Sequence, residues 1–220
     1  MKFEFNEVYP KIFVLSFDSE YDLAMHFLRF QEYYESPNPS FRNNVFSLID
    51  YMEWYSKSFG RGCFTYPNDW GGFNISGCVI HDVFKKGIPD INKYDLFMKK
   101  LFNTMRKRYG KEFYLIGIKK GDESTYKHEL SHAFWNMIPE YKEEMKTLLK
   151  SIPKELNKAI RKFLSDNMYD ESVLDDEIHA YLSTGLNSGL KDYLKDHKNE
   201  LKETMKLFEK VFDKYFACIV

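Results

Sequence analysis

The sequence predicts a mainly helical α+β protein, with a small mixed α/β lobe followed by an all-helical lobe. Two short apolar runs, residues 12–17 and 113–118, have the length and residue types of buried strands, and both lie in the first half. From Pro139 onward every segment instead repeats its apolar residues with helical spacing. A chain of 220 residues with 44% hydrophobic and 18% aromatic residues can bury a substantial core. We therefore expect two lobes, 1–138 and 139–220, with an active-site cleft between them.

The first half is expected to contain both strands and helices. Asp18 or Ser19 caps a helix that runs to about Tyr34, where the Ser-Pro-Asn-Pro segment 36–39 ends it. Two more helices are expected at about 45–58 and 94–109. Between them, the glycine-containing stretch 60–77 is expected to be a long loop or a short-stranded region. The apolar run 113–118 is interpreted as an edge strand with which an extended peptide pairs.

The second half is expected to contain only helices. Their predicted ranges are about 141–149, 151–164 and 171–186. A stripe of apolar residues from Leu190 to Phe212 predicts one long final helix.

Charge and cysteine content limit the classes of binding partner and the cellular location that we expect for this protein. The 32 Lys and Arg residues nearly balance the 33 Asp and Glu residues, giving a net charge of −1, so neither nucleic acid nor a membrane surface is an expected partner. No stretch reaches the roughly 18 apolar residues of a membrane span, and Glu4 and Glu7 interrupt any signal peptide. Three widely spaced cysteines form no disulfide framework. These features predict a soluble, cytoplasmic protein.

One motif carries recognisable chemistry. Residues 128–132 read His-Glu-Leu-Ser-His, an uninterrupted H-E-x-x-H. On a helix, positions i and i+4 share a face, so the imidazoles of His128 and His132 can converge on one zinc ion at about 2.0–2.1 Å each. Glu129 is rotated by about 100° from His128, so it flanks the metal and can take a proton from its water. The sequence therefore predicts a zinc site with Glu129 as catalytic base.

The context of the motif supports this interpretation. It follows a predicted strand directly, Asp122 supplies a helix cap, no Pro or Gly interrupts the helix up to Met137, and Pro139 ends it. The five-residue pattern arises by chance in roughly one such sequence in a hundred. The alternative is that His128 and His132 are ordinary polar residues on a helix face.

The third ligand is sought in a later helix. A third histidine at the metzincin spacing is absent, because position 138 is Ile. In the segment 175–181, Glu177 stands on one helix face with Ala180 and Tyr181, so the small Ala180 can let this helix approach and deliver the carboxylate to the metal. Glu177 is therefore the expected third ligand.

Other residues of this segment have open roles. His179, roughly opposite Glu177 on the helix, can be the third ligand instead, a transition-state donor or a surface residue. Tyr181 can donate a hydrogen bond to an oxyanion or simply pack. Asp176 or Asp175 can orient a ligand histidine through its second ring nitrogen, or be solvated.

The set His128, His132 and Glu177-x-x-Ala180 resembles the gluzincin branch of the zincin metallopeptidases, the thermolysin-like group. In that group a downstream helix supplies the glutamate ligand, often within N-E-x-x-[SA]-D; here Asp176 and Tyr181 replace the Asn and the final Asp. The resemblance implies a zincin-like fold and zinc-dependent hydrolysis of peptide or protein substrates. The alternatives are a zinc hydrolase for another bond, a catalytically silent zinc protein, and an interaction protein in which the motif is incidental.

Overall fold

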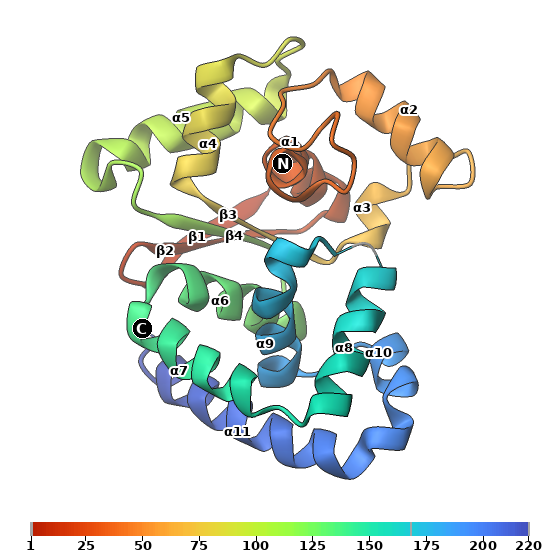
Figure 1. Cartoon of the computed structure of the whole chain (residues 1–220). Helices are drawn as coiled ribbons and strands as arrows, with labels where there is room; N and C mark the ends of the chain where they lie inside the picture. The colour runs from red at the N-terminus through yellow and green to blue at the C-terminus, as the bar shows by residue number, and fades with distance from the viewer. Residues whose placement is uncertain (1, 168, 220) are drawn as a thin grey trace. The chain divides into compact units, whose positions relative to one another are not determined.

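The computed structural model describes residues 2–167 and 169–219 of the chain. Within them the protein is mainly helical with one small mixed sheet, as the sequence predicted, and it forms two compact units, 1–125 and 126–220 (Figure 1). The helix with the H-E-x-x-H motif, α6 (Glu123–Met137), therefore lies mostly in the helical unit, whereas the sequence placed the lobe boundary after residue 138. The reason is packing, because Phe134 of α6 contacts Tyr141 and Phe212 of that unit.

The sheet of the first unit has four strands in the order β1-β2-β4-β3. Strand β2 (Ile12–Phe17) pairs antiparallel with β1 (Phe3–Tyr9) and parallel with β4 (Tyr114–Lys119), and β4 pairs antiparallel with β3 (Gly72–Ser76). The expectation that the 113–118 run forms an edge strand is therefore wrong. A continuous apolar run that is buried residue after residue, as in β4, is typical of a central strand.

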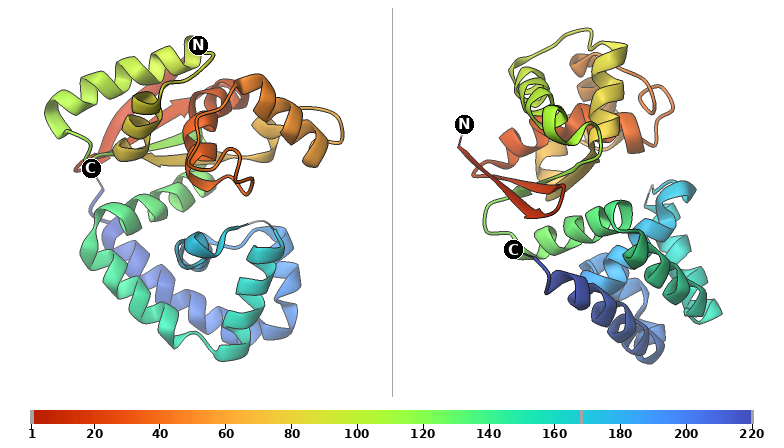
Figure 2. Two further views of the ribbon diagram at one scale, coloured as in Figure 1. Left: turned by 45° about the horizontal axis from the view of Figure 1, so that its top comes forward. Right: turned by 90° about the vertical axis from the view of Figure 1, so that its left-hand side faces the viewer.

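Helices lie over one face of this sheet, as the two views in Figure 2 show. Helix α1 (Glu20–Glu35) begins at Ser19, whose hydroxyl accepts the backbone N–H of Asp22 at 3.2 Å, as the sequence indicated. It packs on β2, β3 and β4 and touches α4 (Gly77–Lys86) and α5 (Lys93–Tyr109). The unit is completed by α2 (Leu48–Ser58) and α3 (Tyr66–Asp69).

Strand β1 and helix α4 of the first unit were not predicted from the sequence, and neither was the short helix α3. Strand β1 is exposed along most of its length and contains two glutamates, so its alternating pattern does not resemble that of a buried strand. Helix α4 has only ten residues and begins at a glycine, Gly77, which is a poor helix former.

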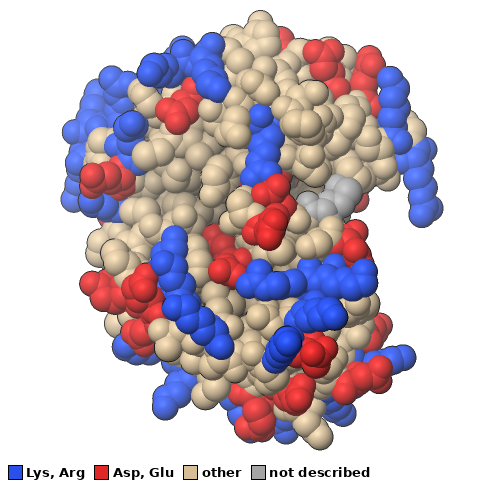
Figure 3. All heavy atoms as spheres, viewed as in Figure 1, with Lys and Arg blue, Asp and Glu red and all other residues tan. Residues whose placement is uncertain are grey.

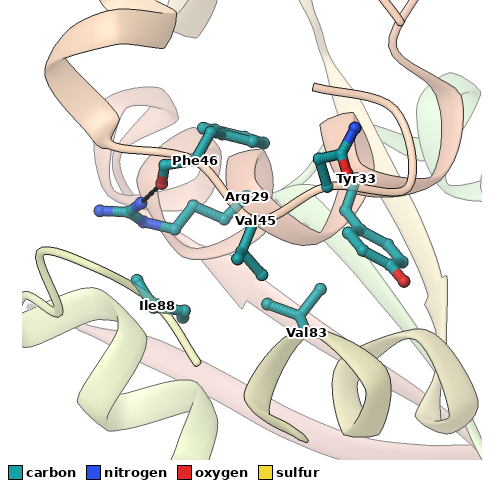
Figure 4. Close-up of a pocket in the computed structure, with 7 residues that line it drawn as sticks. Arg29, Tyr33, Val45, Phe46, Val83 and Ile88 are labelled. Atoms are coloured by element: carbon teal, nitrogen blue, oxygen red, sulfur yellow. Dashed lines mark hydrogen bonds between the residues drawn. The ribbon is translucent and has the colours of Figure 1, made fainter. Parts of the chain in front are cut away.

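A buried arginine joins α1 to two loops of this unit. Arg29, 4% exposed, donates a hydrogen bond to the backbone oxygen of Phe46 (Figure 4) and pairs with the carboxylates of Asp90 at 2.7 Å and Asp95 at 3.2 Å. The depression beside it, lined by Val45, Val83 and other residues, is too small to hold a water molecule. We therefore regard this cluster as structural.

Basic side chains gather over α5, as Figure 3 shows. Its last turn carries Arg106, Lys107 and Arg108, which complement the negative end of the helix dipole. Gly110 ends the helix with a φ of 64°, a conformation that favours glycine.

The second unit is built around α9 (Leu174–Thr184), which packs against α7, α8 and α11. Seven of its side chains are buried, and a single turn of 3-10 helix precedes it. Besides most of α6, this unit contains α7 (Pro139–Ser151), α8 (Lys154–Asp166), α10 (Ser188–Tyr193) and α11 (Lys198–Phe216).

The prediction of one long final helix is wrong. The backbone leaves the helical conformation at Leu194 (φ −92°, ψ 13°), and a 3-10 turn separates α10 from α11. Leu190 before the bend and Leu194 at the bend are both fully buried, and Leu201 is buried further on. Among the described residues, no helix has both the length and the hydropathy needed to cross a bilayer.

Candidate metal centre

Helix α6 presents both histidines of the motif on one face. Its first turn is capped by Asp122, whose carboxylate accepts the N–H of Thr125 at 3.0 Å and its hydroxyl at 2.7 Å. One helical turn apart, the rings of His128 and His132 have centroids at 4.9 Å, and their Nε2 atoms lie 3.3 Å from each other. This is the spacing that positions i and i+4 were expected to give.

Helix α9 brings Glu177 to the same point. Its Oε1 lies 3.6 Å from Nε2 of His132, and its Oε2 lies 3.9 Å from Nε2 of His128. These three side chains form a cluster whose ligand atoms all lie within 4.8 Å of one another. His179 does not belong to this cluster.

These separations suit a tetrahedral cation site. Donor atoms held about 2.0–2.1 Å from a common ion at tetrahedral angles lie about 3.3–3.5 Å apart. The two Nε2 atoms lie 3.3 Å apart, at this value. The nearest carboxylate oxygens of Glu177 lie farther out, Oε1 at 3.6 Å from His132 and Oε2 at 3.9 Å from His128. Two imidazoles and one carboxylate are a donor set found at catalytic zinc sites. The side chains of His128, His132 and Glu177 are therefore placed so that together they could hold one metal ion.

The ring of His132 is held from behind by a carboxylate. Oδ1 of Asp176 lies 2.7 Å from Nδ1 of His132, and Oδ2 accepts a hydrogen bond from Asn136 at 3.4 Å. When the ring of His132 is neutral and donates Nδ1–H to Asp176, its Nε2 lone pair faces the cluster. Of the two aspartates that the sequence left open, Asp176 has this role, whereas Asp175 pairs with Arg161.

His179 lies in the core behind this carboxylate. It is fully buried, its ring stacks on Trp135 at 4.7 Å, its Nε2 donates to the backbone oxygen of Ser131 at 3.2 Å, and its Nδ1 lies 3.4 Å from Asp176. The interpretation of His179 as a surface residue is therefore wrong. A fully buried ring cannot touch a substrate, so the role of transition-state donor also does not fit. Helix α9 is covered on more sides than its sequence suggests, because α7, α8 and α11 all pack on it.

Burial and neighbouring charges push the two histidines in opposite directions. Burial, together with His132 and His179, lowers the pKa of His128 well below its usual value. Burial also opposes the charged form of His132, but Asp176, Glu177 and Glu129 raise its pKa well above the usual value. His132 in turn lowers the pKa of Asp176 against the effect of burial. The surroundings thus favour the neutral form of His128 and the charged form of His132.

Glu129 and Tyr181 lie next to the cluster. Glu129 is 7% exposed, and its carboxylate acts electrostatically on both His132 and Tyr181. The ring of Tyr181 lies 4.9 Å from that of His128, and its hydroxyl contacts the hydroxyl of Tyr169 at 3.1 Å and accepts a hydrogen bond from Asn187 at 3.2 Å. Burial is the main cause that raises the pKa of Tyr181, so its hydroxyl stays protonated and can donate.

The two sides of the cluster differ in exposure. The side chain of His128 is 21% exposed, whereas that of His132 is only 5% exposed. Access from solvent is therefore on the side of His128, where Tyr181 lies.

Sequence reasoning missed three residues around the cluster, namely Tyr169, Thr184 and Asn187. Thr184 alone left a signal, because it follows Glu177 by seven residues and so shares its helix face. Tyr169 and Asn187 lie outside α9 and reach Tyr181 only through the tertiary fold. Comparison with models of known families, with curated proteins and with solved structures finds no match to this chain.

Proposed function

We propose that this protein is a zinc-dependent hydrolase of the peptidase type, in which His128, His132 and Glu177 hold the ion and Glu129 is the general base. The observation that carries the proposal is the convergence of two imidazoles and one carboxylate from two helices, with one ligand atom of each within 4.8 Å of the others. The order of the H-E-x-x-H motif and the later Glu177-x-x-Ala180 motif, which resembles that of gluzincins, supports the same proposal. A zincin-like fold is part of the proposal, supported by strand β4, which directly precedes the H-E-x-x-H helix.

Each residue has a defined chemical task. A zinc ion bound here supplies a Lewis acid that acidifies water and polarises a carbonyl group. Glu129 accepts the proton released during attack on that carbonyl and returns it to the leaving amine. Tyr181, on the exposed side of the cluster, donates its O–H to the oxyanion that develops.

Peptide or protein is the substrate class that we infer from this donor set and from the resemblance. A cytoplasmic location is also part of the proposal. It is supported by Cys63, Cys78 and Cys218, which are all free and exposed, because exposed thiols suit a reducing compartment.

Metal analysis and turnover together test the proposal. Purified protein should contain one zinc ion per chain, and it should cleave members of a mixed peptide library in a reaction that a chelator stops and added zinc restores. Glu129→Gln should keep the zinc and the fold while losing nearly all turnover. The matched control is Glu140→Gln on the exposed face of α7.

The outcomes separate the alternatives. Absence of stoichiometric zinc argues for an interaction protein with an incidental motif. Zinc without cleavage of any peptide indicates a silent site or another substrate. Full activity of Glu129→Gln removes Glu129 from the mechanism. Glu177→Gln should bind zinc much more weakly than wild type, and unchanged affinity contradicts the ligand role.

A further inference from the structure

Both ring nitrogens of His128 have defined surroundings. Its Nε2 faces the cluster, 3.3 Å from Nε2 of His132 and 3.9 Å from Glu177. Its Nδ1 faces Thr184, whose Oγ1 lies 3.4 Å away. Because an imidazole that binds a metal through Nε2 carries its proton on Nδ1, the group that faces Nδ1 must be an acceptor.

Thr184 can only accept in this position. Its hydroxyl has one proton, and that proton is donated to the backbone oxygen of Ala180, four residues earlier, at 2.7 Å. What remains toward His128 is an oxygen lone pair. The hydrogen bond therefore runs from Nδ1–H to Oγ1, which selects the tautomer whose Nε2 lone pair is open toward the cluster.

The placement of Thr184 follows from the pitch of α9. Thr184 is seven residues after Glu177, so the two side chains lie on one face about two turns, or about 10 Å, apart along the axis. Glu177 faces Nε2 of His128 and Thr184 faces Nδ1 of the same ring. Asp176, next to Glu177, holds His132. One helix thus carries the third ligand and the acceptors for both histidines.

We propose that Thr184 is a positioning residue, which holds the ring of His128 and fixes its tautomer so that Nε2 binds the metal. This role rests on the proposed zinc site. The acceptor is neutral and the hydrogen bond is long, whereas the acceptor for His132 is a close carboxylate. Removing the Thr184 acceptor should therefore weaken zinc binding by only about three- to tenfold, the range expected for one neutral hydrogen bond.

Thr184→Val tests the proposal, because valine keeps the shape and branching of the side chain and lacks the acceptor. The affinity of the full-length protein for zinc is measured by competition with a chelator of known affinity, and the geometry of the site by the absorption spectrum of its cobalt form. Thr184→Val should bind zinc about three- to tenfold more weakly than wild type and should change the cobalt spectrum. Thr184→Ser, which keeps the hydroxyl, should have the zinc affinity and the cobalt spectrum of wild type.

The chain offers a matched control in Thr204 of α11. Its hydroxyl also donates to the backbone oxygen four residues earlier, that of Glu200, at 2.8 Å. Within the described part of the chain, this hydroxyl has no histidine as a hydrogen-bond partner. Thr204→Val should have the zinc affinity of wild type. Any loss shared by both valine variants is then an effect on the helices, not on the site.

A second measurement does not depend on the variants binding metal. In nitrogen-15 spectra of the metal-free protein, His128 should be the Nδ1–H tautomer, its signal being assigned by its absence in His128→Asn, and Thr184→Val should lose this preference. Wild-type protein that binds neither zinc nor cobalt overturns the proposed function and the positioning role together. Zinc binding that is equally tight in wild type and Thr184→Val, or an Nε2–H tautomer in wild type, overturns the positioning role alone.

Discussion

The carboxylate of Asp176 lies 2.7 Å from Nδ1 of His132, although 44 residues separate them in the sequence. This contact joins α9 to α6 directly beside the convergence of His128, His132 and Glu177. It makes His132 the better held of the two histidines, because a charged acceptor binds an N–H more strongly than a neutral one.

Replacing this carboxylate tests how strongly a residue that contacts a ligand histidine affects zinc affinity. Asp176→Asn should weaken zinc binding about 10- to 100-fold, more than Thr184→Val does, because the amide keeps the size of the side chain but loses its charge. The control is Asp175→Asn, which changes the neighbouring, exposed aspartate that pairs with Arg161. Chelator competition measures both. Equal affinities for the two variants would show that Asp176 does not support the site.

Tyr181→Phe tests the oxyanion donor. Loss of the hydroxyl should lower kcat by about 100-fold and leave zinc content and KM nearly unchanged, because the hydrogen bond is needed only when negative charge develops on the substrate. Tyr193→Phe is the control, since Tyr193 is exposed and its ring lies against Phe163. A Tyr181→Phe protein with wild-type kcat would leave the phenol a packing role only.

A buried carboxyl in the first unit gives the protein a pH-dependent stability. Burial raises the pKa of Glu32 to about 6 from an ordinary value of 4.5, against hydrogen bonds from Tyr66, Tyr51 and Ser36. The folded state therefore favours the protonated form. The stability from this group is complete below pH 4.5 and is lost as the pH rises through 6, a total of about 2 kcal/mol.

Glu32→Gln should remove this loss, because glutamine accepts the same hydrogen bonds without ionising. The free energy of unfolding, measured with urea from pH 4 to pH 8, should fall by about 2 kcal/mol more in wild type than in Glu32→Gln. Glu53→Gln on the exposed face of α2 should follow wild type. If the free energy of unfolding changes with pH in the same way in wild type and Glu32→Gln, the raised pKa of Glu32 is contradicted.

Gly117 explains how closely α1 approaches the sheet. A Cβ atom at this position of β4 would lie 2.4 Å from the ring of Phe27 and 2.8 Å from the side chain of Leu23, both on α1. Gly117→Ala should therefore destabilise the protein by about 3 kcal/mol, the upper end of the range for overpacked cores. Gly189→Ala is the control, because its nearest neighbour is at an ordinary 3.4 Å. Thermal unfolding compares the two, and similar melting temperatures would contradict the tight fit.

The local features of this protein were determined by short stretches of sequence. The apolar run of β2, the Ser19 cap of α1 and the Asp122 cap of α6 each depend on neighbours within a few residues, so pattern alone located them. The H-E-x-x-H spacing fixed the positions of His128 and His132 on one helix face for the same reason.

The tertiary structure decided whatever depends on which elements become neighbours. It made β4 a central strand, buried His179 behind Asp176 and bent the chain at Leu194. It also chose Asp176 over Asp175 and placed Thr184 behind His128. Helical periodicity in the sequence predicts which side chains share one face of a helix. Which residues that face contacts is determined only by the packing of α9 against other helices.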